Sequence, residues 1–181
     1  YIFSRGEFLT AYTPYQPEAS QGTLQAMYEF QSLLCDLTGM EVANASLYDG
    51  GSALAEAAIL GLRETERKKL VMLPTVHPEY RQTVRTYLAG TQVEICEPAS
   101  AEGVADLEMV GRELDSNTAA LIVQMPNAFG SLEPVEELGR LAHAAGALFI
   151  VAVNPISLGV LRPPGSYGAD VVGGEGQPLG T

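Results

Sequence analysis

Two apolar runs, Ala119-Ala-Leu-Ile-Val-Gln-Met125 and Leu148-Phe-Ile-Val-Ala-Val153, decide the fold of this 181-residue chain. Both runs are almost unbroken, so each is predicted to be a strand that is covered on both faces. The segment between them starts at Pro134 and stops before Gly146, which are the signals of a helix over 134–145. A buried strand, a helix and a second buried strand in succession indicate a parallel sheet.

The same alternation extends through the rest of the chain. Further strands are predicted at 70–73, 92–96 and 170–172, and helices at 23–38, 52–67, 78–89 and 107–114. We therefore predict an α/β fold with a doubly wound, mostly parallel sheet, in which residues 23–181 form the large domain and residues 1–22 an extended arm. Ligand sites in such sheets lie beyond the carboxyl ends of the strands. That rule selects the loops at 49–52, 74–77, 125–130, 154–159 and 173–177.

Composition and charge exclude several classes of protein. The formal net charge is −12 and no basic cluster exceeds residues 63–69, so we expect no binding to nucleic acid or to an anionic membrane. Cys35 and Cys96 lie in apolar surroundings and are predicted to be reduced core thiols. No apolar run is long enough to span a bilayer and no leader is evident, so we expect a cytoplasmic protein. The chain starts at Tyr1 and stops in a loop-like run at 177–181, and we expect it to be a fragment of a longer polypeptide.

The arm contains a stiff polar loop at 10–22. Pro14 and Pro17 fix their own φ angles and favour extended geometry in the residues before them. Tyr12, Tyr15 and Gln16 are therefore presented from a rigid backbone, which suits contact with a ligand or a partner. A proline-rich linker with surface tyrosines is the alternative.

Several strand-end residues are candidates for ligand binding, each with a structural alternative. Asp49-Gly-Gly-Ser52 begins a helix, where free N–H groups favour an anion, although Asp49 would equally serve as a helix cap that opposes a phosphate. Asn127 could donate to a ligand oxygen or could make a turn. His77 could stack on a ring or act as a base, whereas His143 lies in a helix and is expected to be a packing or surface residue. No ligand-spaced set of Cys, His, Asp and Glu predicts a metal site.

The lysines restrict the chemistry most strongly. Lys68 and Lys69 are the only two, and they are adjacent at a predicted helix-to-strand junction instead of a strand-end loop. Schiff-base chemistry needs a lysine in the cleft, with its pKa lowered by that environment. This stretch of chain therefore offers no lysine for it.

Three stretches carry a resemblance to a known family: Tyr12-Thr-Pro-Tyr-Gln-Pro-Glu-Ala-Ser-Gln-Gly22, Ala43-Asn-Ala-Ser-Leu-Tyr-Asp49 and Leu161-Arg-Pro-Pro-Gly165. They resemble the glycine decarboxylase P-protein family, and Gly174-Glu-Gly-Gln-Pro-Leu-Gly180 resembles its bacterial subunit 1, the N-terminal or α subunit of the two-chain form. The resemblance covers nearly the whole chain. It implies the fold type I architecture of pyridoxal-phosphate enzymes, an α2β2 heterotetramer with subunit 2 (β), and lipoylated H-protein as a further partner. Together these proteins decarboxylate glycine and pass the aminomethyl group to the lipoyl arm.

Two positions depart from the family's cofactor-bearing half. Gln177 stands where the Schiff-base lysine is expected, and Asn154 where an aspartate would pair with the pyridinium nitrogen. A glutamine amide cannot form an aldimine, and an asparagine amide lacks the charge that keeps a pyridinium protonated. The resemblance thus implies that the pyridoxal 5'-phosphate lies in the partner subunit and that none is bound by this chain alone.

The resemblance also assigns roles to the candidates already named. Tyr12, Tyr15 and Gln16 are expected to project into the partner's active site and to contact glycine or the cofactor. Asp49, Ser52 and Asn127, with the two amides, become relic positions of a lost cofactor cleft. Two alternatives stay open: a self-sufficient fold type I lyase or aminotransferase whose lysine lies outside this stretch, and a purely structural scaffold subunit.

Overall fold

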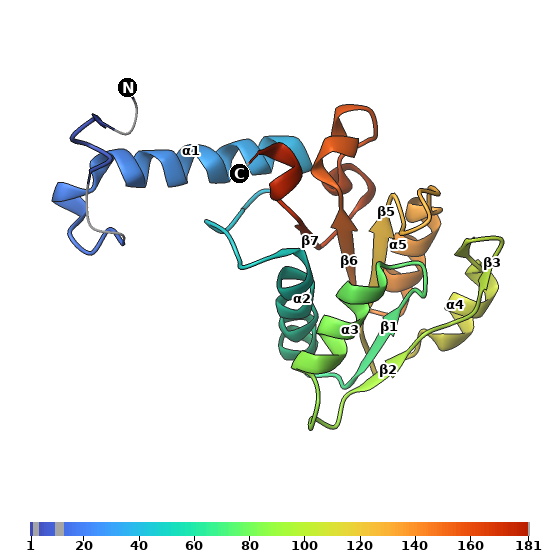
Figure 1. The fold of residues 1–181 in the computed structure, drawn as a ribbon. Coiled ribbons are helices and arrows are strands. Elements are labelled where there is room, and N and C mark those ends of the chain that lie inside the picture. The colour runs from blue at the N-terminus through green and yellow to red at the C-terminus, as the bar shows by residue number, and fades with distance from the viewer. Residues whose placement is uncertain (2–3, 10–12, 181) are drawn as a thin grey trace. The chain divides into compact units, whose positions relative to one another are not determined.

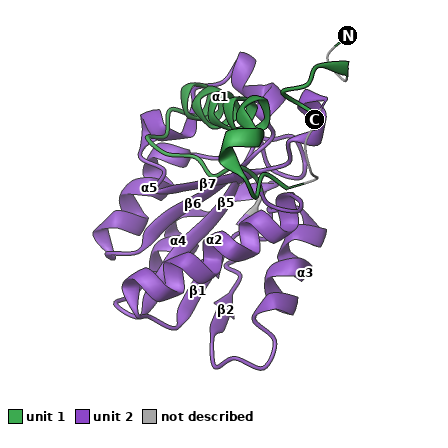
Figure 2. Cartoon of the chain, turned by 90° about the vertical axis from the view of Figure 1, so that its left-hand side faces the viewer, with its two compact units in different colours: residues 1–46 green, residues 47–181 purple. Residues whose placement is uncertain are grey.

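The structure is a computed structural model that describes residues 1, 4–9 and 13–180, and it divides into two compact units. Unit 1 comprises residues 1–46 and unit 2 residues 47–181 (Figure 2). The predicted arm at 1–22 therefore shares a unit with the helix that follows it. Tyr12, one of the predicted site residues, lies outside the described residues.

Unit 1 contains the short 3-10 helix η2 (Pro17–Ala19) and the helix α1 (Gln21–Thr38). Gly39 ends α1 in the left-handed conformation, with φ of 70°, and its N–H donates to Cys35 O at 2.8 Å. A residue without a Cβ adopts this conformation with little strain, which is why glycine so often follows a helix. The predicted helix at 23–38 is confirmed, with its first turn two residues earlier.

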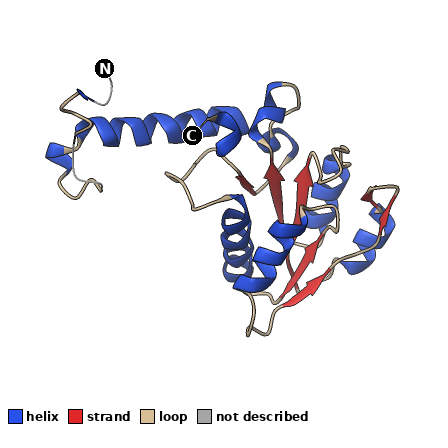
Figure 3. Ribbon diagram, in the orientation of Figure 1, coloured by secondary structure: helices blue, strands red, loops and turns tan. Residues whose placement is uncertain are grey.

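Unit 2 is built on a five-stranded parallel sheet (Figures 1 and 3). The order is β2-β1-β5-β6-β7, and every adjacent pair is parallel. The strands are β1 (Lys69–Met72), β2 (Glu94–Cys96), β5 (Thr118–Met125), β6 (Leu148–Val153) and β7 (Val171–Gly174). The two apolar runs that predicted the fold are adjacent, and Ile122 of β5 is in register with Ile150 of β6.

Helices cover both faces of the sheet: α2 (Gly50–Thr65), α3 (Pro78–Tyr87), α4 (Leu107–Glu113) and α5 (Val135–Ala144). Gly61 of α2 lies against Ile150, whereas Gly139 of α5 lies against the ring of Phe149. Consecutive strand residues point to opposite faces, so these two helices pack on opposite sides of β6. Both side chains are fully buried. The predicted doubly wound α/β fold is confirmed.

Short elements account for the differences from the predicted pattern. They are the hairpin of β3 (Ser100–Ala101) and β4 (Val104–Ala105) and the 3-10 helices η3 (Pro155–Gly159), η4 (Pro164–Tyr167) and η5 (Gln177–Leu179). Strands of two residues and helices of one turn are too short to display a hydrophobic period. Within the described part of the chain, every helix is too short or too polar to cross a bilayer.

Candidate functional site at the carboxyl edge of the sheet

The site predicted by topology lies where the strand order reverses. The chain passes from β1 to its neighbour β2 on one side and returns to β5 on the other, so the carboxyl ends of β1 and β5 flank the switch point. Two of the predicted loops meet there. Ala128 N donates to Thr75 O at 2.9 Å, and His77 N donates to Gln124 Oε1 at 2.8 Å.

A buried carboxylate, Glu133, joins the segments around this switch point. The residue is 4% exposed. Its Oε1 accepts from Thr75 Oγ1 at 2.6 Å and from Asn127 Nδ2 at 2.8 Å, while Oε2 accepts from Ala105 N at 2.8 Å. Strand β4 and the segments that follow β1 and β5 are thereby tied to one side chain. Sequence reasoning missed Glu133, because the local sequence Glu-Pro does not distinguish a buried glutamate from one in a solvent-exposed loop.

Asn127 is occupied by contacts within the chain. Its Nδ2 donates to Gly103 O at 2.8 Å as well as to Glu133, and its Oδ1 accepts from Phe129 N at 3.0 Å and Ser131 N at 3.1 Å. The amide therefore uses both of its donors and two acceptor positions without a ligand. This arrangement favours the turn alternative for Asn127.

The amino end of α2 holds two carboxylates. Ser52 N donates to Asp49 Oδ1 at 2.6 Å and Asp49 N to Ser52 Oγ at 3.0 Å, which together make a capping box. The Asp49 carboxylate accepts from the Ser52 backbone N–H and also from the Ser52 hydroxyl, at 2.8 Å, and these two hydrogen bonds, the backbone one first, lower the pKa of Asp49. Glu175, which follows β7, accepts from Gly50 N at 3.0 Å through Oε2. The N–H groups that favour an anion are bonded to the chain's own carboxylates.

Tyr80 completes the surroundings of this helix end. A Cβ on Gly50 would lie 2.4 Å from the Tyr80 hydroxyl oxygen, so glycine at this position allows the phenol to approach α2. Burial, with the charges of Glu175 and Asp49, raises the pKa of Tyr80, so its proton is firmly held. The rings of His77 and Tyr80 are 5.3 Å apart. The His77 Nδ1 accepts from Glu79 N at 3.3 Å, which makes His77 the cap of α3.

The two amides lie at the ends of neighbouring strands. Asn154 follows β6 and caps η3, with Oδ1 accepting from Ile156 N at 3.1 Å. Gln177 follows β7 and is exposed, and its N–H donates to Glu175 Oε1 at 3.3 Å. The 3-10 helices η3 and η5 contact each other, so both amides belong to the carboxyl edge.

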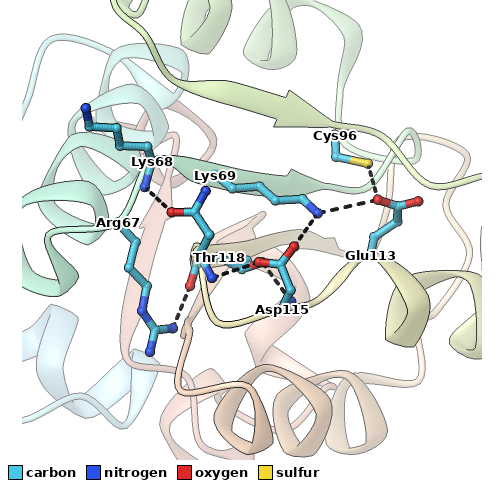
Figure 4. Close-up of polar contacts among 8 residues, drawn as sticks. Arg67, Lys68, Lys69, Cys96, Glu113, Asp115 and Thr118 are labelled. Carbon is cyan, nitrogen blue, oxygen red and sulfur yellow. Dashed lines mark hydrogen bonds and ion pairs between the residues drawn. The ribbon is translucent and has the colours of Figure 1, made fainter.

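The lysines lie at the opposite, amino edge (Figure 4). Lys69 is the first residue of β1, and its Nζ is 2.9 Å from Asp115 Oδ2 and 3.6 Å from Glu113 Oε2. Burial alone would lower the pKa of Lys69, but these carboxylates, with Glu94, raise it overall. The eight residues of β5 separate the two edges by roughly 25 Å. Neither lysine can therefore reach the carboxyl edge.

The remaining candidates belong to other parts of the chain. Tyr15, in unit 1, is 76% exposed, and Gln16 precedes η2 in the same unit. His143 lies in α5, with Nε2 2.9 Å from Asp170 Oδ2. Within the described residues, no group of three or more His, Cys, Asp and Glu side chains is placed to hold a metal ion.

Comparison with known proteins gives one family. The model of the glycine cleavage system P-protein matches residues 1–181. A probable glycine dehydrogenase (decarboxylating) subunit 1 from Carboxydothermus hydrogenoformans is 55% identical over 100% of this chain and 41% of its own length. A protein of the same description from Desulfitobacterium hafniense is 57% identical over 99% of this chain and 40% of its own length. The chain thus spans about 40% of the curated relatives it matches.

Solved structures agree with this result. A crystal structure of glycine decarboxylase (P-protein) in inhibitor-bound form superposes with a TM-score of 0.91 and 49% identity, over 99% of this chain and 40% of that one. A cystathionine gamma-lyase from Micromonospora echinospora, 20% identical, has a TM-score of 0.66 over 85% of this chain and 39% of that one, a likeness of fold alone. From its match along the whole length and its identity to subunit 1 proteins, the chain belongs to the glycine cleavage system P-protein family.

Proposed function

We propose that this chain is part of the cofactor-free subunit of glycine decarboxylase and that it completes the active site of a cofactor-bearing subunit 2. In this proposal the α2β2 assembly decarboxylates glycine and passes the aminomethyl group to lipoylated H-protein. The relatives carry the description subunit 1, and a first subunit requires a second. Pyridoxal 5'-phosphate in subunit 2 would supply the electron sink for the decarboxylation.

The observation that carries the proposal is the chemistry of the carboxyl edge, which does not fit a pyridoxal phosphate of this chain's own. Asp49 and Glu175 hold the amino end of α2, where their charges would repel a phosphate. Asn154 and Gln177 present amides in place of a carboxylate and an amine. Lys69 lies at the other edge with a raised pKa. No step is therefore assigned to this cleft, and its five positions Asp49, Ser52, Asn127, Asn154 and Gln177 are proposed to be structural.

The arm supplies the groups that we assign to the partner's site. The Tyr15 and Tyr12 phenols would donate hydrogen bonds, and the Gln16 amide would both donate and accept, so together they would orient glycine or the cofactor. Around Tyr15 and Gln16 the loop is held by local hydrogen bonds, since Tyr15 N donates to Thr13 O at 2.9 Å and Gln21 Nε2 to Pro17 O at 2.6 Å. A fixed donor stabilises charge that develops during a reaction without reorganising.

The test is a Tyr15→Phe substitution in full-length subunit 1, assembled with subunit 2 and H-protein. Loss of one positioned donor should lower the exchange of the glycine carboxylate with bicarbonate by about 100-fold. Tyr87→Phe in α3 is the matched control and should leave the rate unchanged. An unchanged rate for Tyr15→Phe, repeated for Tyr12→Phe, with assembly intact, would favour the purely structural scaffold.

The location of the cofactor is tested separately. Borohydride reduction of the assembled complex, followed by peptide mapping, should place the pyridoxyl-lysine on subunit 2 alone. An adduct on a lysine elsewhere in full-length subunit 1 would instead support a self-sufficient fold type I enzyme.

A further inference from the structure

The carboxylate of Glu175 binds backbone N–H groups from two different elements. Its Oε2 accepts from Gly50 N, at the amino end of α2, at 3.0 Å, and its Oε1 accepts from Gln177 N, in η5, at 3.3 Å. Within the described residues, no lysine or arginine forms an ion pair with it. Two N–H groups that converge on one negative charge are the arrangement by which a protein backbone binds an anion. Here the anion is a side chain of the same protein.

Glu175 is not needed to cap α2. Ser52 N donates to Asp49 Oδ1 at 2.6 Å, and Ala53 N donates to Asp49 O at 2.9 Å, so the residue before the helix already holds its first turn. Glu175 comes from 125 positions further along the chain and accepts from Gly50 N alone in this helix. Its contact therefore occupies an N–H group that the cap leaves over.

The space in front of the two glycines is also filled from within. Glycine in a phosphate-binding loop allows the ligand to approach the backbone. A Cβ on Gly50 would instead lie 2.4 Å from the Tyr80 hydroxyl oxygen and 3.2 Å from Glu175 N, and a Cβ on Gly51 would lie 3.1 Å from Thr83 Oγ1. The missing Cβ atoms thus make room for groups of the chain itself.

We propose that Glu175 is the residue that excludes phosphate esters from this cleft, because its carboxylate takes the N–H groups that a phosphate would need. This inference rests on the proposed function and deepens it, since it names the group that keeps the cofactor out of this subunit. A phosphate would compete with Glu175 for Gly50 N and Gln177 N and would be repelled by its charge. Without that carboxylate the two N–H groups would be free, with the Tyr80 hydroxyl beside them as a further donor.

The experiment measures the binding of inorganic phosphate by equilibrium dialysis. Full-length subunit 1 is assembled with subunit 2 that is saturated with pyridoxal phosphate. Glu175→Ala should lower the Kd for phosphate by about tenfold or more, because a negative charge is lost and two converging donors are freed. Glu175→Gln should lower it less, because the glutamine oxygen can still accept from Gly50 N. If Glu175→Ala does not assemble, Glu175→Gln carries the test.

Glu56→Ala is the matched control. Glu56 is exposed in the second turn of α2, so its removal takes one charge from the same helix but frees no N–H group. The Kd for phosphate should equal that of the parent. If Glu175→Ala and Glu56→Ala bind phosphate equally well, Glu175 does not exclude it and the inference is wrong.

Amide hydrogen exchange locates the bound ion. In Glu175→Ala, phosphate should slow exchange in the peptide that contains Gly50 and leave it unchanged in the parent. Unchanged exchange there in Glu175→Ala would overturn the inference, because any phosphate would then be bound elsewhere.

The proposed function has a separate readout in the same samples. Borohydride reduction of the Glu175→Ala complex should still place the pyridoxyl-lysine on subunit 2, since the substitution supplies no lysine. If phosphate binding is not gained but the adduct stays on subunit 2, the inference alone falls. An adduct on subunit 1 of the parent complex would overturn both.

Discussion

Cys96 shows how a single neighbour controls the chemistry of a side chain at the amino edge. Its Sγ donates to Glu113 Oε2 at 3.0 Å (Figure 4). Burial, with the hydrogen bond and negative charge of Glu113, raises the pKa of Cys96 to about 11. The thiolate is the reactive form of cysteine, so this thiol is chemically protected although it is not fully buried.

Alkylation measures that protection. At pH 8 a pKa of about 11 leaves roughly one thiolate in a thousand, so iodoacetamide should modify Cys96 very slowly and faster as the pH rises towards 11. Glu113→Gln removes the charge, lowers the pKa and should speed the reaction at pH 8. Mass spectrometry of the Cys96 peptide over a pH series gives both rates. Equal rates for the parent and Glu113→Gln would show that Glu113 has no influence on the thiol.

At the scale of elements, two glycines occupy helices on the same face of the sheet for different reasons. A Cβ on Gly139 of α5 would meet the Phe149 ring at 3.2 Å and Tyr167 O at 3.4 Å. Phe149 is fully buried and cannot retreat. A Cβ on Gly111 of α4 would meet only Leu141 Cδ2, at 3.8 Å, which is an ordinary contact.

Alanine substitutions should therefore have opposite effects. Gly139→Ala should lower the free energy of unfolding by about 1–3 kcal/mol, because the added methyl group overpacks α5 against β6. Gly111→Ala should raise it by up to about 1 kcal/mol, because alanine has the higher helix propensity. Urea unfolding of the two variants gives both values. If Gly139→Ala instead raised the free energy of unfolding, α5 could move away from β6 without a loss of stability.

The elements also show what the sequence could predict. The strands at 119–125 and 148–153 and the helix at 78–89 are long or have strong end signals, and their predictions are confirmed within about two residues. At the site, Asp49 could be recognised as a cap from its position before two glycines. Glu133, Tyr80 and Glu175 could not be found, because each has a defining partner far away in sequence: Glu133 binds Thr75 across 58 positions, and Glu175 contacts Gly50 across 125. Sequence periodicity reports local geometry and carries no record of such contacts.

At the scale of the whole molecule, Glu133 connects the loops at the carboxyl ends of β1 and β5 with the hairpin of β3 and β4. It accepts hydrogen bonds from β4 and from the segments after β1 and β5. These segments share no strand pairing, since the hairpin of β3 and β4 is a separate two-stranded sheet. Its carboxylate holds the hairpin and the Asn127 turn onto the main sheet.

Glu133→Ala should therefore be among the more harmful single substitutions. It would leave Thr75 Oγ1, Ala105 N and one of the two N–H groups of the Asn127 amide without an acceptor, and we expect a loss of about 3 kcal/mol or more in the free energy of unfolding. Glu136→Gln is the control, because Glu136 is exposed in a surface ion pair with Arg162 and should change stability by less than about 1 kcal/mol. Urea unfolding compares them. If the two variants changed the free energy of unfolding by similar amounts, the buried hydrogen bonds of Glu133 would contribute little to stability.

The separation of β1 from β5 along the chain affects the order of synthesis. β1 ends at Met72, but its central neighbour β5 begins only at Thr118, after both β2 and the hairpin. During synthesis from the amino end, the apolar residues of β1 therefore leave the ribosome well before β5 has been made. One edge of β1 has no strand to pair with during that time. Until then β1 can pair only with the three-residue β2, so the nascent chain exposes an open strand edge and is expected to need a chaperone at that stage.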